Sequence, residues 1–100
     1  MKRLIFHEDA EVEFKEAVDY YELKSSGLGL DFAADVQARC ASIQLRPERF
    51  PFYKKTRMQR CLTHRFSYVV FFRVFKDHIS IIAVAHVKRR PDYWSHRAVA

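Results

Sequence analysis

The chain has 100 residues, of which 49% are hydrophobic, with only 2 Gly and 3 Pro. This composition excludes a disordered chain and predicts one globular domain over residues 1–100 with a single core. The apolar run nearest the N-terminus, residues 4–6, is too short for a secretory signal, and no stretch is long enough to span a membrane. We therefore expect a cytoplasmic protein without a membrane partner.

Charge is distributed unevenly along the chain, whose formal net charge is +6. Residues 1–35 hold 4 Lys/Arg and 9 Asp/Glu, whereas residues 36–100 hold 14 and 3. The second part predicts a positive surface that suits phosphate groups or an acidic partner. Ordinary solvated charge is the alternative interpretation.

The first third of the chain predicts a short strand and two helices. Residues 2–6 are typical of a strand, and apolar residues then recur at helical spacing from Glu8, with acidic residues near the positive end of the helix dipole. Gly27 is expected to end this helix in a left-handed conformation. A second helix is predicted over residues 30–45, because Pro47 disfavours helical backbone just before it.

The rest of the chain predicts a loop and three strands. Residues 47–57 contain two prolines and no clear period, so they are expected to form a loop. The following strands are predicted over residues 58–66, 68–75 and 78–86, and short connections make them antiparallel. The expected fold is α+β with the order β-α-α-β-β-β, in which a helical hairpin packs on one face of a small, mainly antiparallel sheet.

A charged corner follows the last predicted strand. His86 ends the strand, the cations Lys88 to Arg90 come next, and Pro91 is expected to turn the chain. An imidazole beside cations could transfer protons in RNA cleavage while the cations stabilise the phosphate. The alternative is that His86 hydrogen-bonds the tail and fixes this corner.

Basic and aromatic residues of the C-terminal half predict a surface for nucleic acid or another target. Aromatic side chains at Tyr53, Tyr93 and Trp94 offer rings on which bases could stack. In the alternative interpretation, Tyr93 and Trp94 pack beneath the tail. The predicted contact residues are Arg60, Arg65, Arg73, Lys88, Arg90 and Trp94.

Cysteine and histidine spacings give no sign of a metal or cofactor. Cys40 and Cys61 lie in separate predicted elements and are expected to be reduced thiols. The five histidines match no zinc motif, and the chain has no glycine-rich phosphate loop. We expect no metal site and no bound cofactor.

Five stretches in order carry a resemblance over nearly the whole chain: AEVEFKEAVDYYE, GLGLDFAADV, RPERFP, HRFSYVVFFRV and AVAHVKRRPDYW. Together they resemble toxins of the RelE/ParE superfamily from type II toxin–antitoxin systems. The resemblance implies a small bacterial protein that arrests growth when free. It also implies a cognate acidic antitoxin that neutralises the toxin in a hetero-oligomer, and either DNA gyrase or the ribosome with its mRNA as the target.

The two branches of the superfamily differ at single positions. RelE-like members are metal-independent mRNA endoribonucleases, and their cation and C-terminal tyrosine correspond to Arg89 and Tyr93 here. With His86, these two residues form the candidate catalytic set, if the chain is an enzyme. Arg60 falls near a further basic position of those enzymes.

One departure favours the ParE-like branch, which inhibits DNA gyrase. The arginine that RelE-like ribonucleases carry after the aromatic of the central strand is replaced by Val69, which follows Tyr68. The presence of a histidine, His86, at the end of the last predicted strand is a second feature that resembles ParE-like chains. The alternatives are a RelE-like mRNA endonuclease, a non-toxic nucleic-acid-binding module, and a degenerate toxin that only binds its antitoxin.

Overall fold

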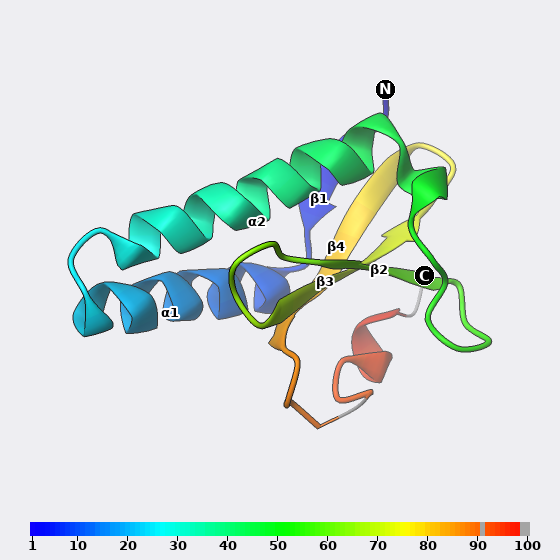
Figure 1. Ribbon diagram of the computed structural model, residues 1–100. Helices are drawn as coiled ribbons and strands as arrows, with labels where there is room; N and C mark the ends of the chain where they lie inside the picture. The colour runs from blue at the N-terminus through cyan, green and yellow to red at the C-terminus, as the bar shows by residue number, and fades with distance from the viewer. Residues whose placement is uncertain (91, 99–100) are drawn as a thin grey trace.

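A computed structural model describes residues 1–90 and 92–98. Two helices lie on one face of a four-stranded sheet, which confirms the predicted β-α-α-β-β-β order and the α+β class (Figure 1). None of the helices in these residues is long and apolar enough to cross a bilayer. The elements are β1 (Arg3–Phe6), α1 (Glu8–Lys24), α2 (Leu28–Leu45), the 3-10 helix η1 (Pro47–Arg49), β2 (Met58–Leu62), β3 (Tyr68–Val74), β4 (His78–His86) and the 3-10 helix η2 (Ser95–Ala98).

The sheet has the order β1-β4-β3-β2. Strand β1 pairs in parallel with β4, and the other two pairs are antiparallel. The outer edge of β2 is covered by the preceding loop, since Phe52 bridges to Gln59 and the Pro51 carbonyl accepts from the Arg60 N–H at 3.1 Å. This cover removes part of an open strand edge that would otherwise be free to pair with another chain.

The helical hairpin is held by its turn. Gly27 has φ 88°, which confirms the predicted left-handed backbone, although α2 then begins at Leu28, earlier than expected. The Glu22 carboxylate accepts from the backbone N–H groups of Gly27 at 2.9 Å and Gly29 at 3.0 Å. A Cβ at Gly29 would lie 2.5 Å from the Val18 carbonyl oxygen, so the two helices approach at a distance that only glycine allows.

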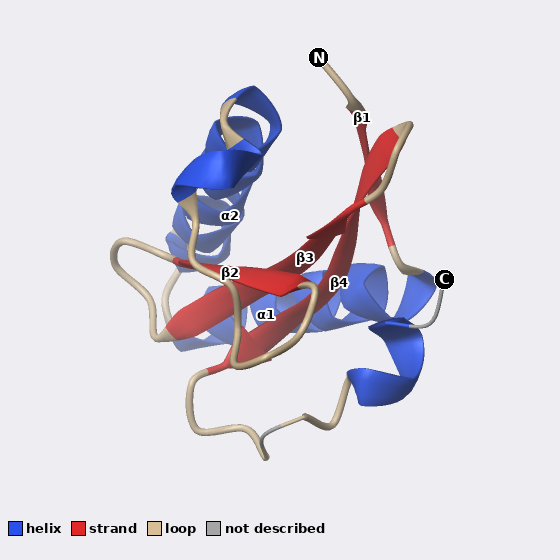
Figure 2. Cartoon of the chain, turned by 90° about the vertical axis from the view of Figure 1, so that its right-hand side faces the viewer, coloured by secondary structure: helices blue, strands red, loops and turns tan. Residues whose placement is uncertain are grey.

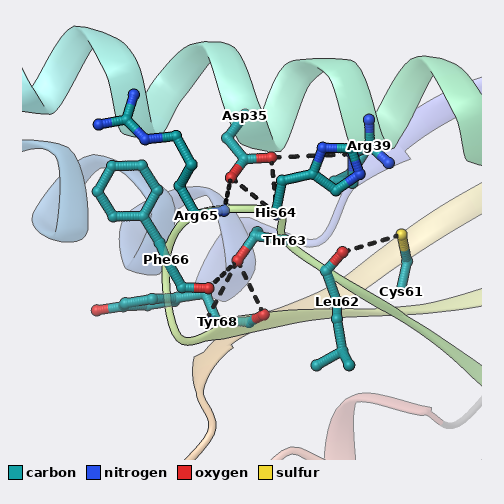
Figure 3. A network of polar contacts seen from close by, with 9 residues as sticks. All are labelled: Asp35, Arg39, Cys61, Leu62, Thr63, His64, Arg65, Phe66 and Tyr68. Carbon is teal, nitrogen blue, oxygen red and sulfur yellow. Dashed lines mark hydrogen bonds and ion pairs between the residues drawn. The ribbon is translucent and has the colours of Figure 1, made fainter.

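Strand β2 ends at Leu62, and the prediction that it continues to residue 66 is wrong. The reason is a side-chain acceptor: the Asp35 carboxylate of α2 accepts from the backbone N–H groups of His64 and Arg65 at 2.9 to 3.1 Å (Figure 3). The Thr63 hydroxyl closes the turn by donating to the Phe66 carbonyl. The segment predicted as a loop over 47–57 also contains η1, because proline is compatible with the first turn of a helix.

An irregularity in β4 gives the protein two apolar layers. Phe71 pairs with Ala83 and Phe72 with Ile81, which leaves Ile82 without a partner in β3. The extra residue rotates the side chains, so Ile81 packs with the helices while Ile82 and Ala83 belong to a second cluster that includes Trp94. The C-terminal segment covers that second face. In Figure 2 this segment passes below the sheet and ends to the right of it.

Candidate functional site

A pocket of about 170 Å³ lies on the face of the sheet opposite the helices. Its floor comes from β3 and β4, where Val69, Phe71 and Ala85 are buried. The pocket is lined by six of the residues that the sequence predicts as catalytic or target-binding, namely Arg60, His86, Arg89, Arg90, Tyr93 and Trp94. The fold therefore joins the end of β4, the edge strand β2 and the tail around one cationic hollow.

Tyr93 is held between two guanidinium groups and a carboxylate. The Arg89 guanidinium carbon lies 4.1 Å from the centre of the Tyr93 ring, and that of Arg97 lies 5.1 Å from it. The Tyr93 hydroxyl donates a hydrogen bond of 2.7 Å to Glu13 Oε2. Burial and this hydrogen bond raise the pKa of the Tyr93 phenol above its ordinary value, so the hydroxyl stays protonated and is a poor proton acceptor.

Glu13 and Arg97 form an ion pair that sequence reasoning missed. Both Arg97 terminal nitrogens lie 3.0 Å from Glu13 oxygens, and the Arg97 side chain is 8% exposed. The pair also covers the edge of β4 beyond the end of β1, because Glu13 accepts from the Val84 N–H at 3.1 Å and Arg97 donates to the Ile82 carbonyl at 3.2 Å. No local sequence pattern predicts this pair, because Glu13 is one of several acidic residues in the N-terminal part of α1.

His86 fixes the corner after β4. Its Nδ1 accepts from the Lys88 backbone N–H at 3.1 Å, and its ring meets that of Tyr68 edge-on at 5.3 Å. These contacts agree with the alternative in which the imidazole holds the start of the tail. Burial raises the pKa of the Tyr68 phenol, so Tyr68 also remains neutral near pH 7.

Trp94 supports the pocket from inside the second apolar cluster. Its side chain is 4% exposed, and its ring centre lies 4.8 Å from that of Phe71 and 5.5 Å from that of Tyr53. The indole therefore packs beneath the tail, as the alternative from the sequence has it, and does not present a free ring for base stacking. By packing on Phe71 of β3, the Trp94 side chain holds the C-terminal segment against the sheet.

Three other predicted contact residues do not line this pocket. Arg65 lies in the β2–β3 turn, where its guanidinium is 3.5 Å from Asp31 Oδ2. Arg73 lies at the far end of β3 with its guanidinium 4.6 Å from the centre of the Phe75 ring. Lys88 is exposed in the turn after β4, and Pro91, which is expected to turn the chain, lies outside the described residues.

The pocket has an apolar floor and a mainly cationic rim, which also includes the carboxylate of Asp92, paired with Lys54 at 3.2 Å. Arg60, Arg89 and Arg90 are exposed around buried aliphatic and aromatic side chains. Guanidinium groups bind phosphate and carboxylate oxygens through paired N–H donors. Over residues 1–90 and 92–98, no three His, Cys, Asp or Glu side chains gather as a metal site would require.

Comparison with known proteins defines the class. The family model described as the ParE toxin of the type II toxin–antitoxin system, parDE, matches residues 4–91, so the chain belongs to the ParE toxin family. A comparison with curated proteins finds no match.

A solved structure described as "Chromosomal ParDE TA system from P. aeruginosa" has the same fold. It aligns with a TM-score of 0.73 and 17% sequence identity, covering 86% of this chain and 96% of that chain. This likeness shows that the hairpin-on-sheet fold is shared with that structure.

Proposed function

We propose that this protein is the toxin of a bacterial type II toxin–antitoxin pair, which arrests growth when free and is neutralised by a cognate acidic antitoxin in a hetero-oligomer. Membership of the ParE toxin family supports this function. The excess of cations in residues 36–100 supports an acidic partner, because complementary charge speeds association and fixes its orientation.

DNA gyrase is the target that the pocket favours. The observation that carries this choice is the position after Tyr68, where Val69 stands in place of the arginine of the ribonuclease branch, so the floor of the pocket is apolar there and lacks that cation. The Tyr93 hydroxyl is also engaged by Glu13. The pocket is then a docking surface, in which cations at Arg60, Arg89 and Arg90 meet acidic groups of the target.

A second candidate is a metal-independent, ribosome-dependent mRNA endonuclease. It is favoured by the presence of His86, Arg60 and Arg89 around one pocket, where an imidazole lies among cations suited to a scissile phosphate. This activity needs His86 or another group to accept a proton, and His86 Nδ1 already accepts from Lys88.

The test begins with inducible expression of the full chain in bacteria, alone and with the small acidic protein expected to be its antitoxin. We expect growth arrest that the antitoxin relieves, together with loss of gyrase supercoiling by the purified toxin. Cleaved transcripts in primer-extension mapping with normal supercoiling would instead establish the endonuclease. Tight antitoxin binding without growth arrest would identify a degenerate toxin.

Paired variants then test the pocket. Arg89→Ala removes an exposed cation above Tyr93, and we expect about tenfold weaker gyrase inhibition. Arg3→Ala in β1 is the matched control, because Arg3 is also an exposed arginine but does not line the pocket. Equal inhibition by both variants would exclude the pocket as the docking surface.

A further inference from the structure

A second hollow, of about 380 Å³, lies between the last turns of α2 and η1, away from the pocket described above. Three arginines, Arg39, Arg46 and Arg49, line it together with Ser42, Leu45 and Phe50. Among residues 1–90 and 92–98, no carboxylate lines it, although Glu48 lies between two of these residues in the sequence. A compact group of like charges repels itself unless an anion lies among them.

Two of these three arginines have uncompensated charges in the described part of the protein, whereas Arg39 pairs with Asp35 at 3.8 Å. Among the described residues, the side chains of Arg46 and Arg49 have no hydrogen-bonded or ion-pair partner, and both residues are exposed. One cation at the end of α2 would satisfy the negative end of the helix dipole. The dipole does not account for three arginines around one hollow.

Arg39 forms a long ion pair with Asp35, a carboxylate that it shares with the β2–β3 turn. Its side chain is 19% exposed, and its Nε is buried without a hydrogen-bond acceptor in the described part of the chain. The nearest carboxylate oxygen, Asp35 Oδ1, is 3.8 Å from Nε, and both Asp35 oxygens already accept backbone N–H groups of the β2–β3 turn (Figure 3). Asp35 therefore offsets the Arg39 charge only in part, because its oxygens also accept two backbone N–H groups.

We propose that this hollow binds a phosphate group of a nucleic-acid backbone. The forked donors of three guanidiniums match the oxygens of a phosphate, and the Ser42 hydroxyl adds a neutral donor. The exposed Leu45 and the half-buried Phe50 provide an apolar wall against which a sugar or base packs. An acidic peptide would use the cations but would gain less from that wall.

A basic loop links the hollow to the edge of the first pocket. The loop between η1 and β2 carries the exposed cations Lys55 and Arg57 and leads to Arg60 at the edge of the pocket. Figure 2 shows this loop between η1 and the C-terminal tail on one side of the molecule. A nucleic-acid strand that contacts the hollow can therefore follow the cations of this loop toward Arg60. This binding does not depend on toxin activity.

The test measures binding of fluorescent oligonucleotides to the purified full chain by anisotropy over a range of salt concentrations. In the double variant Arg46→Gln/Arg49→Gln, we expect about tenfold weaker binding at low salt and a slope of log K against log salt that is smaller by about 2. Arg3→Gln is the matched control and should bind like the wild type. Unchanged thermal midpoints show that each variant is folded.

Separate arms distinguish the source of the anion. Duplex DNA and single-stranded RNA of equal length are compared, and inorganic phosphate is used as a competitor. Wild-type affinity and salt slope in the double variant would overturn the proposal. Tight, arginine-dependent binding of poly-glutamate without binding of either nucleic acid would overturn it in favour of an acidic protein segment.

Discussion

Glu13 and Tyr93 are 80 residues apart in the sequence, and the Tyr93 hydroxyl donates to the Glu13 carboxylate at 2.7 Å. The same carboxylate is paired with Arg97 and accepts from the backbone of β4. One side chain of α1 thus connects the helical hairpin, the edge of β4 beyond the end of β1, and the tail. Because the tail carries the wall of the candidate site, Glu13 positions that site without lining its pocket.

Replacement of Glu13 tests this connection. Glu13→Ala leaves the Arg97 guanidinium buried without its main partner, and removal of one member of a buried pair strongly destabilises a protein. We expect the free energy of unfolding to fall by about 3 kcal/mol, near the low end of the range because Asp9 remains 3.6 Å from Arg97 Nε. Urea denaturation followed by Trp94 fluorescence measures the change.

Glu16→Ala is the control for that experiment, since Glu16 is an exposed carboxylate of the same helix. It should change stability by no more than about 0.5 kcal/mol. Equal stability of Glu13→Ala and Glu16→Ala would show that the tail is not held by this ion pair.

The His86 corner gives a second prediction, which separates a structural imidazole from a catalytic one. In His86→Asn, the side-chain carbonyl can still accept the Lys88 N–H, whereas His86→Ala removes the acceptor. We expect growth arrest to persist with asparagine and to weaken with alanine. Loss of arrest in both variants, with unchanged thermal midpoints, would instead assign His86 to the chemistry.

Local sequence patterns were sufficient for the order of the elements. The helical period from Glu8, the left-handed Gly27 and the apolar run of β3 depend on interactions between near neighbours, so they can be read without the fold. The early end of β2 could not be predicted in this way, because it is caused by Asp35, which lies 29 residues before His64 in the sequence. A strand pattern contains no sign of such a distant acceptor.

The candidate site was predictable in part for the same reason. Arg89 and Tyr93 are close in sequence, and the structure places the Arg89 guanidinium 4.1 Å from the Tyr93 ring centre. The burial of Trp94 depends on the face of the sheet that the helices leave open and on the extra residue Ile82 in β4. The composition indicates that a basic and aromatic binding surface is present. It does not show which aromatic side chains are buried beneath that surface.

A third prediction concerns the thiol of Cys40, where burial raises the pKa to about 12 from an ordinary value of 9.0. Below about pH 8 the thiol is almost fully protonated in both the folded and the unfolded chain and contributes little pH dependence. Between about pH 9 and 12 only the unfolded chain releases this proton, so stability decreases as pH rises, by at most about 1.4 kcal/mol per pH unit.

Denaturant unfolding of wild type and Cys40→Ala at pH 8 and pH 10 isolates that contribution, because other titrating groups are common to both proteins. We expect the loss of stability from pH 8 to pH 10 to be smaller in Cys40→Ala. Iodoacetamide should also label Cys40 much more slowly in the folded chain than in urea, since only the thiolate reacts. Rapid labelling of the folded chain at pH 8 would contradict the raised pKa.

The fourth prediction concerns Asp35, whose carboxylate holds the β2–β3 turn to α2 (Figure 3). Asp35→Ala leaves the backbone N–H groups of His64 and Arg65 without their acceptor, and we expect stability to fall by about 1–3 kcal/mol. The loss should be local, so amide exchange should accelerate at His64 and Arg65 far more than in β4. Asp31→Ala is the matched control, because Asp31 contacts Arg65 only through an exposed ion pair, which contributes little. Equal exchange rates in both variants would show that the turn is held by its own backbone and not by α2.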